Sequence, residues 1–147
     1  MNVTREYFTD LTEKIFINLC EYTHTEIVRE GLAISTAQKA TDAAKHDNKK
    51  EKVFGFRTDT LVHVAKIVDK LNKKKKDVKS NYEKELEKSI KKTIDDFLED
   101  KTFTELNSLN VIPRAQVSRL KKHKEKANYY METIGRLADY LEMKDSK

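Results

Sequence analysis

The chain resembles itself when it is shifted along its own length, and this internal similarity constrains its fold more than any other feature of the sequence. When Leu11 is placed on Ile90, two sets of three apolar residues coincide, and within each set the residues recur at every fourth position. That spacing lines one face of a helix. The segment THTEI at 23–27 then falls on TFTEL at 102–106. The apolar pairs are Leu11 with Ile90, Ile15 with Ile94, and Leu19 with Leu98.

Two more similar blocks follow in the same order, and only the gaps between the blocks differ. The pattern Ile-x-x-Ala-Gln occurs at 34–38 and again at 112–116. The segment DTLVHVAKI at 59–67 matches ETIGRLADY at 132–140. Four blocks in one order predict a duplication. The alternative is two generic sets of amphipathic helices that share only their composition.

Glycine and proline are scarce, with three Gly and one Pro among 147 residues. Tight turns depend on these residues for their backbone angles, so their scarcity argues against a sandwich or barrel and predicts an all-α fold. Hydrophobic residues make up 37% of the chain, which suffices for one domain or two very small ones. We therefore expect two tandem helical domains, one in residues 1–72 and one in residues 73–147.

The excess positive charge lies in the second half of the chain. Of 30 Lys and Arg and 25 Asp and Glu, residues 1–72 hold 11 of each, which leaves 19 basic and 14 acidic residues in 73–147. A one-sided basic surface suits a polyanion such as DNA, because neutralising phosphates releases counterions. On charge alone, a solvated lysine-rich surface is the commoner explanation.

The segment TFTELNSLNVIPRAQVSRL at 102–120 predicts two short helices joined by a tight turn. Thr102 and Glu105 have the Thr-x-x-Glu spacing of a capping box, and Pro113 suits the first turn of a second helix. This segment resembles the helix-turn-helix core of the Cro/lambda-repressor-like DNA-binding family. The segment METIGRLADYLEM at 131–143 resembles the helix that follows in that family.

The resemblance covers residues 86–143 and, more faintly, residues 7–71. Two residues depart from the family pattern: Asn107 stands where a small residue is usual, and Val111 stands where glycine is frequent. The resemblance implies two tandem, divergent helix-turn-helix domains.

The resemblance also implies which residues contact DNA. In such a motif the second helix lies in the major groove, and its early outward residues reach the base edges. Arginine suits guanine and glutamine suits adenine, whereas basic residues farther along contact phosphates. Base contacts are expected from Arg114, Ala115, Gln116 and Arg119, and phosphate contacts from Lys121, Lys122, Lys124 and Lys126.

The first copy matches the motif less well. Its corresponding outward places fall on Thr36, Ala37 and Thr41, and Lys39 falls on the apolar place of Val117. We expect a degenerate domain that adds weak DNA contacts through Thr36 and Thr41, or that binds a protein or a second copy of the chain.

Two segments have no counterpart in the repeat. Residues 46–59 contain Phe54 and Phe56, which we expect to cap the first core, with a basic wing on DNA as the alternative. Residues 72–78 contain four consecutive lysines and are expected to form a solvated connector. We expect Tyr129 and Tyr130 to pack in the core, with hydrogen bonds to phosphate as the alternative.

The sequence carries no recognisable catalytic or metal-binding pattern. The four histidines lack close ligand spacing, and a single cysteine cannot build a cysteine-rich zinc site. Cys20 lies in an apolar run and is expected to be a buried thiol. The chain has no long apolar run and no signal-peptide layout, so we expect a cytoplasmic protein without membrane contact, metal, cofactor or enzymatic activity.

These observations favour a sequence-specific duplex-DNA-binding transcriptional regulator, such as a repressor. The two copies would act as an internal pseudo-dimer over two half-sites, or the second copy would bind DNA while the first binds a protein or forms a homodimer. The alternative is a protein-binding inhibitor or adaptor, for example a phage anti-defence factor, that uses helix-turn-helix domains as a scaffold.

Overall fold

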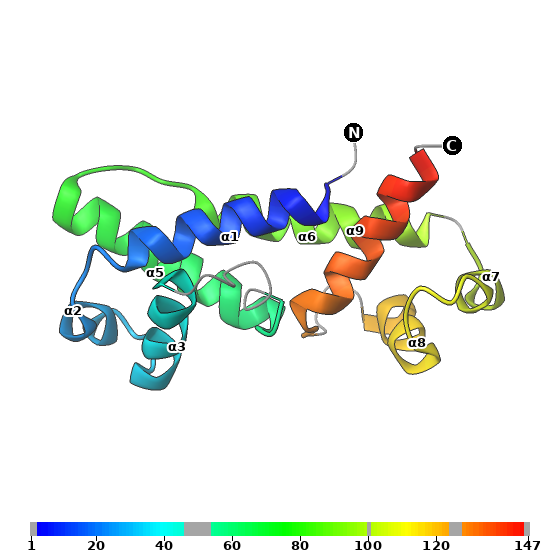
Figure 1. Cartoon of the computed structure of the whole chain (residues 1–147), viewed down its shortest axis with the longest axis horizontal. Helices are drawn as coiled ribbons and strands as arrows, with labels where there is room; N and C mark the ends of the chain where they lie inside the picture. Colours follow the sequence, from blue (N-terminus) through cyan, green and yellow to red (C-terminus); the bar gives the residue numbers. More distant parts are fainter. Residues whose placement is uncertain (1–2, 46–53, 100, 124–127, 146–147) are drawn as a thin grey trace.

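The computed structural model describes residues 3–45, 54–99, 101–123 and 128–145, and Figure 1 shows their arrangement. Within these ranges the chain forms α-helices and no β-strand, which confirms the all-α prediction. None of the described helices is long and apolar enough to cross a membrane. The helices are α1 (Arg5–Leu19), α2 (His24–Arg29), α3 (Ile34–Lys45), α5 (Thr58–Lys76), α6 (Tyr82–Leu98), α7 (Phe103–Ser108), α8 (Arg114–His123) and α9 (Met131–Asp145).

Threonine caps begin the short helices α2 and α7 at equivalent places in the two halves. The Thr23 hydroxyl accepts a hydrogen bond from the Glu26 amide at 3.1 Å, and the Glu26 carboxylate accepts one from the Thr23 amide at 3.0 Å. Thr102 accepts from the Glu105 amide at 3.1 Å, where the Thr-x-x-Glu spacing predicted a helix start. These bonds satisfy amides that a helix start leaves unpaired.

Each short helix is followed by a turn that contains a left-handed residue. Gly31 has φ = 109°, and Asn110 at the equivalent place has φ = 56°. Asparagine tolerates this region better than most residues, so it takes the role of a turn glycine, one position before Val111. Helix α8 begins directly after Pro113, whose carbonyl accepts from the Val117 amide at 3.1 Å. The predicted turn and second helix are therefore confirmed.

The lysine run belongs to a helix. Helix α5 continues to Lys76, so the expected connector at 72–78 is wrong. Asn72 explains the continuation, because it is 3% exposed and its amide donates hydrogen bonds to the side chains of Asn18 and Ser80, each at 3.0 Å. These bonds fasten the end of α5 to α1 and to the linker before α6.

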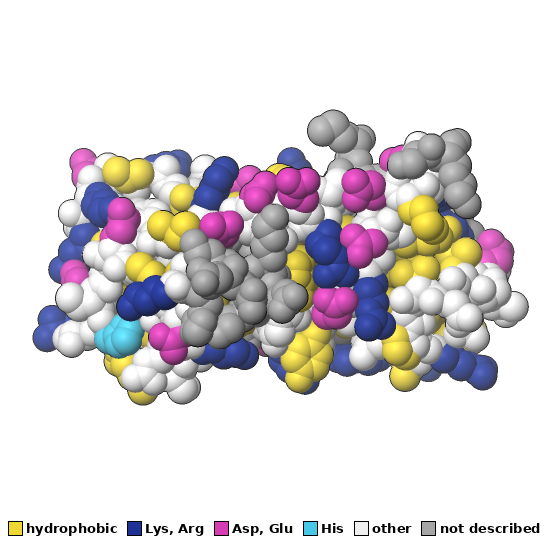
Figure 2. Space-filling model, in the orientation of Figure 1, with side chains coloured by type: hydrophobic (Ala, Val, Ile, Leu, Met, Phe, Trp, Pro, Cys, Tyr) yellow, Lys and Arg dark blue, Asp and Glu magenta, His cyan; other side chains and the backbone are white. Residues whose placement is uncertain are grey.

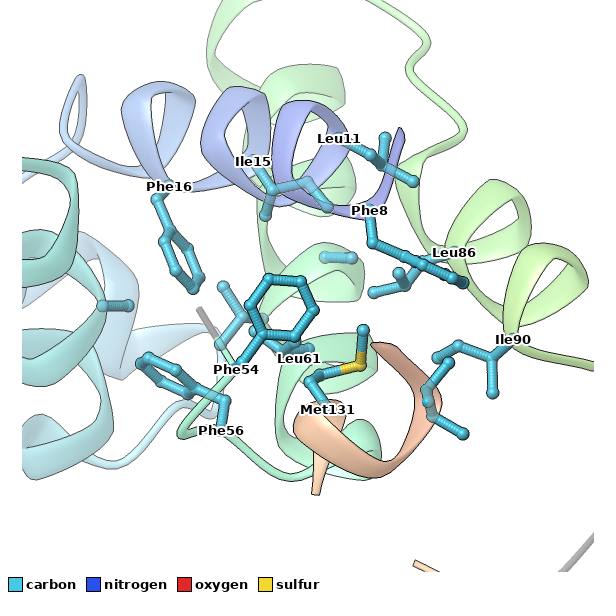
Figure 3. Close-up of a cluster of buried hydrophobic side chains, with 14 of the residues drawn as sticks. Phe8, Leu11, Ile15, Phe16, Phe54, Phe56, Leu61, Leu86, Ile90 and Met131 are labelled. Atoms are coloured by element: carbon cyan, nitrogen blue, oxygen red, sulfur yellow. The ribbon is translucent and has the colours of Figure 1, made fainter. Parts of the chain in front are cut away.

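Helices α1, α5, α6 and α9 build the centre of the molecule, and side chains from both halves share one continuous hydrophobic core. Figure 3 shows the ring of Phe54 between α1 and the start of α9, and the ring of Phe56 beside it, below that of Phe16. The two rings are 7% and 2% exposed, and Phe56 lies 5.2 Å from Phe16 between ring centres. Their expected burial is confirmed, but they lie within the core shared by the two halves and do not cap a separate first core. The alternative basic wing would fall on 46–53, outside the described residues.

The buried positions of α5 recur in α9. The match of residues 59–67 to residues 132–140 places Leu61 on Ile134. The buried residues that this alignment pairs are all at most 1% exposed. In α1 and α6, Ile15 and Ile94 are 1% and 4% exposed. The pairs of α5 and α9 are Leu61 with Ile134, Val64 with Leu137, and Ala65 with Ala138.

The third sequence block has the wrong register. It pairs Ile34 with Ile112, but Ile34 is 48% exposed at the start of α3, whereas Ile112 is 6% exposed before α8. Placing Ile34 on Arg114 instead aligns the first residues of α3 and α8 and also pairs buried side chains. The shared Ala-Gln dipeptide therefore does not mark equivalent positions. The buried pairs, each residue at most 6% exposed, are Leu32 with Ile112, Ala37 with Val117, and Ala40 with Leu120.

The segments that precede α5 and α9 meet through two backbone hydrogen bonds, one on each side of an isolated bridge between Arg57 and Tyr130. In the alignment that places α5 on α9, Thr58 corresponds to Met131 and Phe56 corresponds to Tyr129. The two hydrogen bonds are therefore equivalent to each other. Such a contact is isologous, as at a two-fold axis between identical subunits. The bonds run from the Thr58 amide to the Tyr129 carbonyl at 2.6 Å and from the Met131 amide to the Phe56 carbonyl at 2.8 Å.

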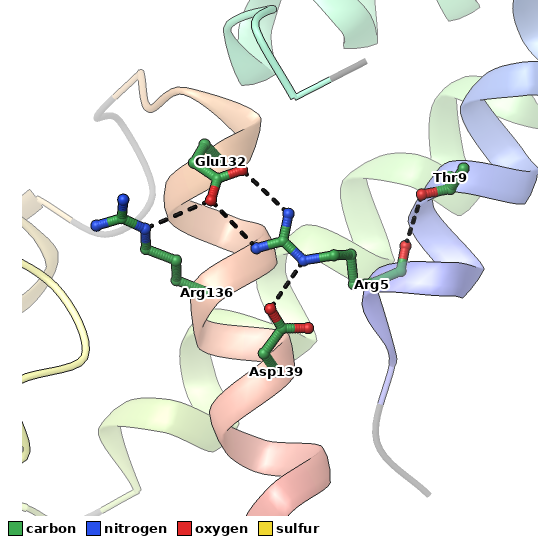
Figure 4. A network of polar contacts seen from close by, with 5 residues as sticks. All are labelled: Arg5, Thr9, Glu132, Arg136 and Asp139. Carbon is green, nitrogen blue, oxygen red and sulfur yellow. Dashed lines mark hydrogen bonds and ion pairs between the residues drawn. The ribbon is translucent and has the colours of Figure 1, made fainter. Parts of the chain in front are cut away.

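A second contact between the halves is ionic. In Figure 4 the Arg5 guanidinium of α1 lies between two carboxylates of α9, with Glu132 at 3.0 Å and Asp139 at 2.8 Å. Hydrogen bonding from Arg5 holds the pKa of Glu132 below its usual value, and Arg136 contributes in the same direction. Helix α9 has Gly135 at this crossing, where an added Cβ would lie 2.8 Å from the Arg5 guanidinium carbon.

Candidate nucleic-acid interface

Helix α8 exposes a face that carries only positive charge. Its inward side is formed by Val117 and Leu120, which are both fully buried. The helical repeat then places the basic residues outward, and α8 contains no Asp or Glu. The exposed basic residues are Arg114, Arg119, Lys121 and Lys122.

These four cations form no ion pair with a side chain in the part of the chain that the structure describes. The lysines at the end of α5 differ, because the last three each pair with a glutamate of the first half. Within the described residues, the charge of α8 is therefore not neutralised by carboxylates, whereas three of the four lysines in the run are paired. The pairs are Lys74 with Glu30 at 2.7 Å, Lys75 with Glu26 at 3.6 Å, and Lys76 with Glu21.

Aromatic rings orient the two arginines of α8. The Arg114 guanidinium lies 5.5 Å from the ring centre of Phe103 at the start of α7. The Arg119 guanidinium lies 5.2 Å from the ring centre of Tyr129 and donates a hydrogen bond to the Asn128 carbonyl at 3.2 Å. Both residues remain exposed, so the stacking limits their movement while their charge stays in solvent.

The residues beside these arginines differ in exposure. Ala115 is exposed next to Arg114, whereas Gln116 is half-buried and its Oε1 is enclosed without a hydrogen-bond partner among the described residues. The expected outward placement of Gln116 is therefore met only in part. Tyr129 is 2% exposed, which confirms its predicted core position, and burial raises the pKa of its hydroxyl. The same prediction for Tyr130 is wrong, because its ring is 49% exposed and lies under the Arg57 guanidinium.

The lysines expected at phosphates lie at and beyond the end of α8. Lys121 is exposed and donates a hydrogen bond to the Lys101 carbonyl at 2.7 Å, and Lys122 is exposed as well. Lys124 and Lys126 lie outside the described residues.

Helix α3 turns other residues outward than the sequence predicted. Thr41 is 4% exposed and its hydroxyl donates to the carbonyl of Ala37 at 3.0 Å, and Ala37 is itself fully buried. The expectation that these two residues face outward is wrong, because it rests on the displaced register. Thr36 is half-buried, at the place of Gln116. The exposed residues of α3 are Ile34, Ser35, Gln38, Lys39, Asp42 and Lys45.

The corrected register also pairs two cation–ring contacts. Lys39 of α3 corresponds to Arg119 of α8, so it does not occupy the apolar place of Val117. The Lys39 ammonium lies 4.4 Å from the ring centre of Phe56, and Arg119 holds the equivalent place over Tyr129. Each outward helix therefore packs a cation onto the aromatic residue before the next long helix.

Helices α3 and α8 lie along one edge of the molecule, the lower edge in Figure 1, and the starts of α5 and α9 lie between them. In the same orientation, Figure 2 shows Asp and Glu gathered in the middle of the upper edge, whereas Lys and Arg predominate along the lower edge from its centre towards α8. Sorting of charge across a small molecule creates a directional field that attracts anions to one side.

Other kinds of site find less support. Among the described residues, no group of three or more His, Cys, Asp and Glu is placed to hold a metal ion. A cleft of about 650 Å³ between α5 and α6 is lined by side chains of both signs, including Asp59, Lys66 and Glu83. The Cys20 thiol is exposed, so its predicted burial is wrong: α1 ends at Leu19, which faces inward, and Cys20 is the cap residue beyond it.

The chain matches none of the protein-family models, curated proteins or solved structures with which it was compared.

Proposed function

We propose that the protein is a non-enzymatic, sequence-specific regulator of transcription that binds duplex DNA. In this proposal α7 and α8 act as a helix-turn-helix unit, with α8 in the major groove. The observation that carries the proposal is the outward face of α8, which has four cations, no carboxylate and no ion pair with the described residues. Such a face suits a polyanion whose phosphates supply the missing negative charge.

The order of residues along α8 supports a division between bases and phosphates. Arg114 and Ala115 are exposed at its start, the part of such a helix that approaches base edges. Arg119 follows about one turn later, and its planar guanidinium suits the O6 and N7 atoms of guanine. Lys122, near the end of α8, would contact the phosphate backbone.

The first half has a supporting role in this proposal. Helices α2 and α3, like α7 and α8, are a short helix and a longer helix separated by a turn with a left-handed residue, and we take them as a second, divergent helix-turn-helix unit. Asp42 stands where α8 has Lys122, so the α3 face carries less positive charge. DNA contacts of α3 would come from Ser35, Gln38 and Lys39 in place of the buried Thr41.

Salt dependence tests the proposal directly. Fluorescence anisotropy with a random-sequence duplex probe would measure the dissociation constant at increasing salt. Phosphate contacts from the four lysines expected to make them, Lys121, Lys122, Lys124 and Lys126, give a log–log slope of about −3.6, so affinity should fall about 150-fold between roughly 50 and 200 mM salt. An affinity for duplex that ignores salt, or no binding at all, would contradict the proposal and favour a protein-binding inhibitor or adaptor.

Two double variants, each of which removes two positive charges, test whether DNA binding depends on the surface of α8 or only on the net charge of the chain. The double variant Lys121→Ala with Lys122→Ala should lose about two phosphate contacts, so its log–log salt slope should be less negative by about 1.8. Lys74→Ala with Lys75→Ala removes two cations that already have glutamate partners, and it should leave the slope unchanged. Equal losses in both variants would show that only the net charge of the chain matters.

Single substitutions in α8 test sequence recognition. Arg119→Ala should cost about 1–3 kcal/mol on a preferred duplex selected from a random pool and should relax the preference at one position. Lys122→Ala should weaken preferred and random duplex by nearly the same factor. If Arg119→Ala also weakens both equally, α8 contacts DNA without reading its sequence.

A further inference from the structure

Arg57 lies at the junction between the two halves, at a position where an arginine does little to stabilise the fold. Arg57 is the N-cap residue of α5, and its side chain makes no capping hydrogen bond. Ser, Thr, Asp and Asn are preferred at this position because their oxygens accept from the first helical amides. A cation also opposes the positive end of the helix dipole. The cap comes instead from the other half, because the Asn128 Oδ1 accepts a hydrogen bond from the Asp59 amide at 3.3 Å. Arg57 therefore has no role in capping α5.

Arg57 keeps its charge available. It is exposed and forms no ion pair with a side chain in the described ranges. Its guanidinium lies 4.3 Å from the ring centre of Tyr130, which is itself 49% exposed. Stacking on Tyr130 limits the positions that the arginine side chain adopts, and the charge is not neutralised.

This stacked pair lies between the two outward helices. On one side Lys39 of α3 packs on Phe56, the neighbour of Arg57 in the chain. On the other side Arg119 of α8 packs on Tyr129, the neighbour of Tyr130. The same place is the centre of the reciprocal hydrogen bonds that relate the two halves. The order along this edge is thus α3, the Arg57–Tyr130 pair, and α8, as the lower edge of Figure 1 shows for the helices.

We infer that Arg57 enters the minor groove at the centre of a DNA target made of two unlike half-sites, one for α3 and one for α8. This inference rests on the proposed DNA-binding function. Reading helices related by a two-fold axis contact major-groove half-sites whose centres lie about 34–36 Å apart on one side of the duplex. The minor groove faces the protein midway between two such segments, opposite Arg57.

The chemistry of Arg57 specifies the sequence at that centre. A·T-rich DNA has a narrow minor groove with enhanced negative potential, and this attracts arginine without any contact to a unique base pattern. The two half-sites should differ because α3 has Ser35 and Gln38 where α8 has Ala115 and Ser118 in the corrected register. One chain would therefore cover a full, non-palindromic site with an A·T-rich middle.

The test is enrichment of duplexes from a random pool with wild type and with Arg57→Ser. Wild type should enrich two unlike half-sites about one helical turn apart with an A·T-rich centre. Arg57→Ser should lose only the central A·T preference. In titrations of one enriched duplex, Arg57→Ser should bind about tenfold more weakly, and the difference should shrink when the centre is changed to G·C.

Arg57→Ser also separates loss of binding from loss of folding. Serine is a good N-cap, so this variant should melt no lower than wild type. Lys70→Ala, which removes an exposed charge from α5, should bind the duplex with a central A·T tract as wild type does. Wild-type behaviour of Arg57→Ser on both centres, or a selected site with a single half-site, would overturn the inference while DNA binding stands. A wild type that enriches no duplex would overturn the proposed function and the inference together.

Discussion

Leu61 of α5 and Ile134 of α9 occupy equivalent buried places in the two halves, at 1% and 0% exposure. If the continuous core makes the chain one cooperative unit, replacing either residue by alanine should destabilise the whole molecule by a similar amount. The relevant comparison is between Leu61→Ala and Ile134→Ala in the otherwise unchanged protein.

The structure sets the size of the effect. Truncating a fully buried leucine or isoleucine to alanine costs about 2–5 kcal/mol, from lost burial and from the cavity that remains. For a chain of this length each 1 kcal/mol lowers the melting temperature by roughly 2–4 °C. Each variant should therefore melt roughly 5–15 °C below wild type. Lys70→Ala and Lys144→Ala, on exposed places of the same two helices, should stay within about 0.5 kcal/mol of wild type.

Scanning calorimetry and native-state hydrogen exchange would measure these effects. We expect one transition in all variants, with a calorimetric enthalpy equal to the van't Hoff enthalpy, and equal loss of protection in α5 and α9. Two separated transitions, with Leu61→Ala shifting one and Ile134→Ala the other, would refute the single core and restore two independent domains.

Three further substitutions probe contacts within and between the halves. Asn72→Ala leaves the buried Tyr22 hydroxyl without its acceptor and should cost about 1–3 kcal/mol in urea unfolding. Gly135→Ala should gain about 1 kcal/mol of helix stability when Arg5 is already alanine, but little in wild type, where the new methyl displaces the Arg5 guanidinium. Arg5 lowers the pKa of Glu132, so the stability from this pair should be full above the unfolded pKa of about 4.3 and lost as pH falls through the lower folded value. Glu132→Gln should remove that part of the pH dependence of the melting temperature.

Local signals in the sequence predicted much of the helical order. The Thr-x-x-Glu spacing at Thr102 located a helix start, and Pro113 located the next one, because both depend on backbone groups within a few residues. The match of residues 59–67 to residues 132–140 aligned two helices whose buried positions correspond. Such features are decided by neighbours along the chain.

Two residues of the same type do not always occupy equivalent environments. The match of Ile34 to Ile112 misplaces α3 by two residues, which in a helix turns a residue by about 200° and exchanges inside for outside. It therefore predicts Thr41 at the surface, where the structure has it buried. Apolar spacing held the correct signal, since Leu32, Ala37 and Ala40 repeat the pattern of the second copy.

The place of Arg57 was beyond any local pattern. Nothing in the sequence says that the residues before α5 and α9 pair with each other, because Arg57 and Tyr130 lie in opposite halves of the chain. The continuation of α5 through Asn72 depended likewise on distant partners, Asn18 above all. These features required the tertiary contacts of the fold.

The reciprocal backbone hydrogen bonds beside Arg57 and Tyr130 join two halves of one polypeptide. This affects how ligand binding depends on protein concentration. Two identical subunits separate on dilution, so their paired form falls with the square of concentration. Here the partner is covalently present at every concentration, so any ligand that spans both halves should saturate along a simple hyperbola with one chain bound. Each half is also free to change alone, since a substitution in one is not copied into the other.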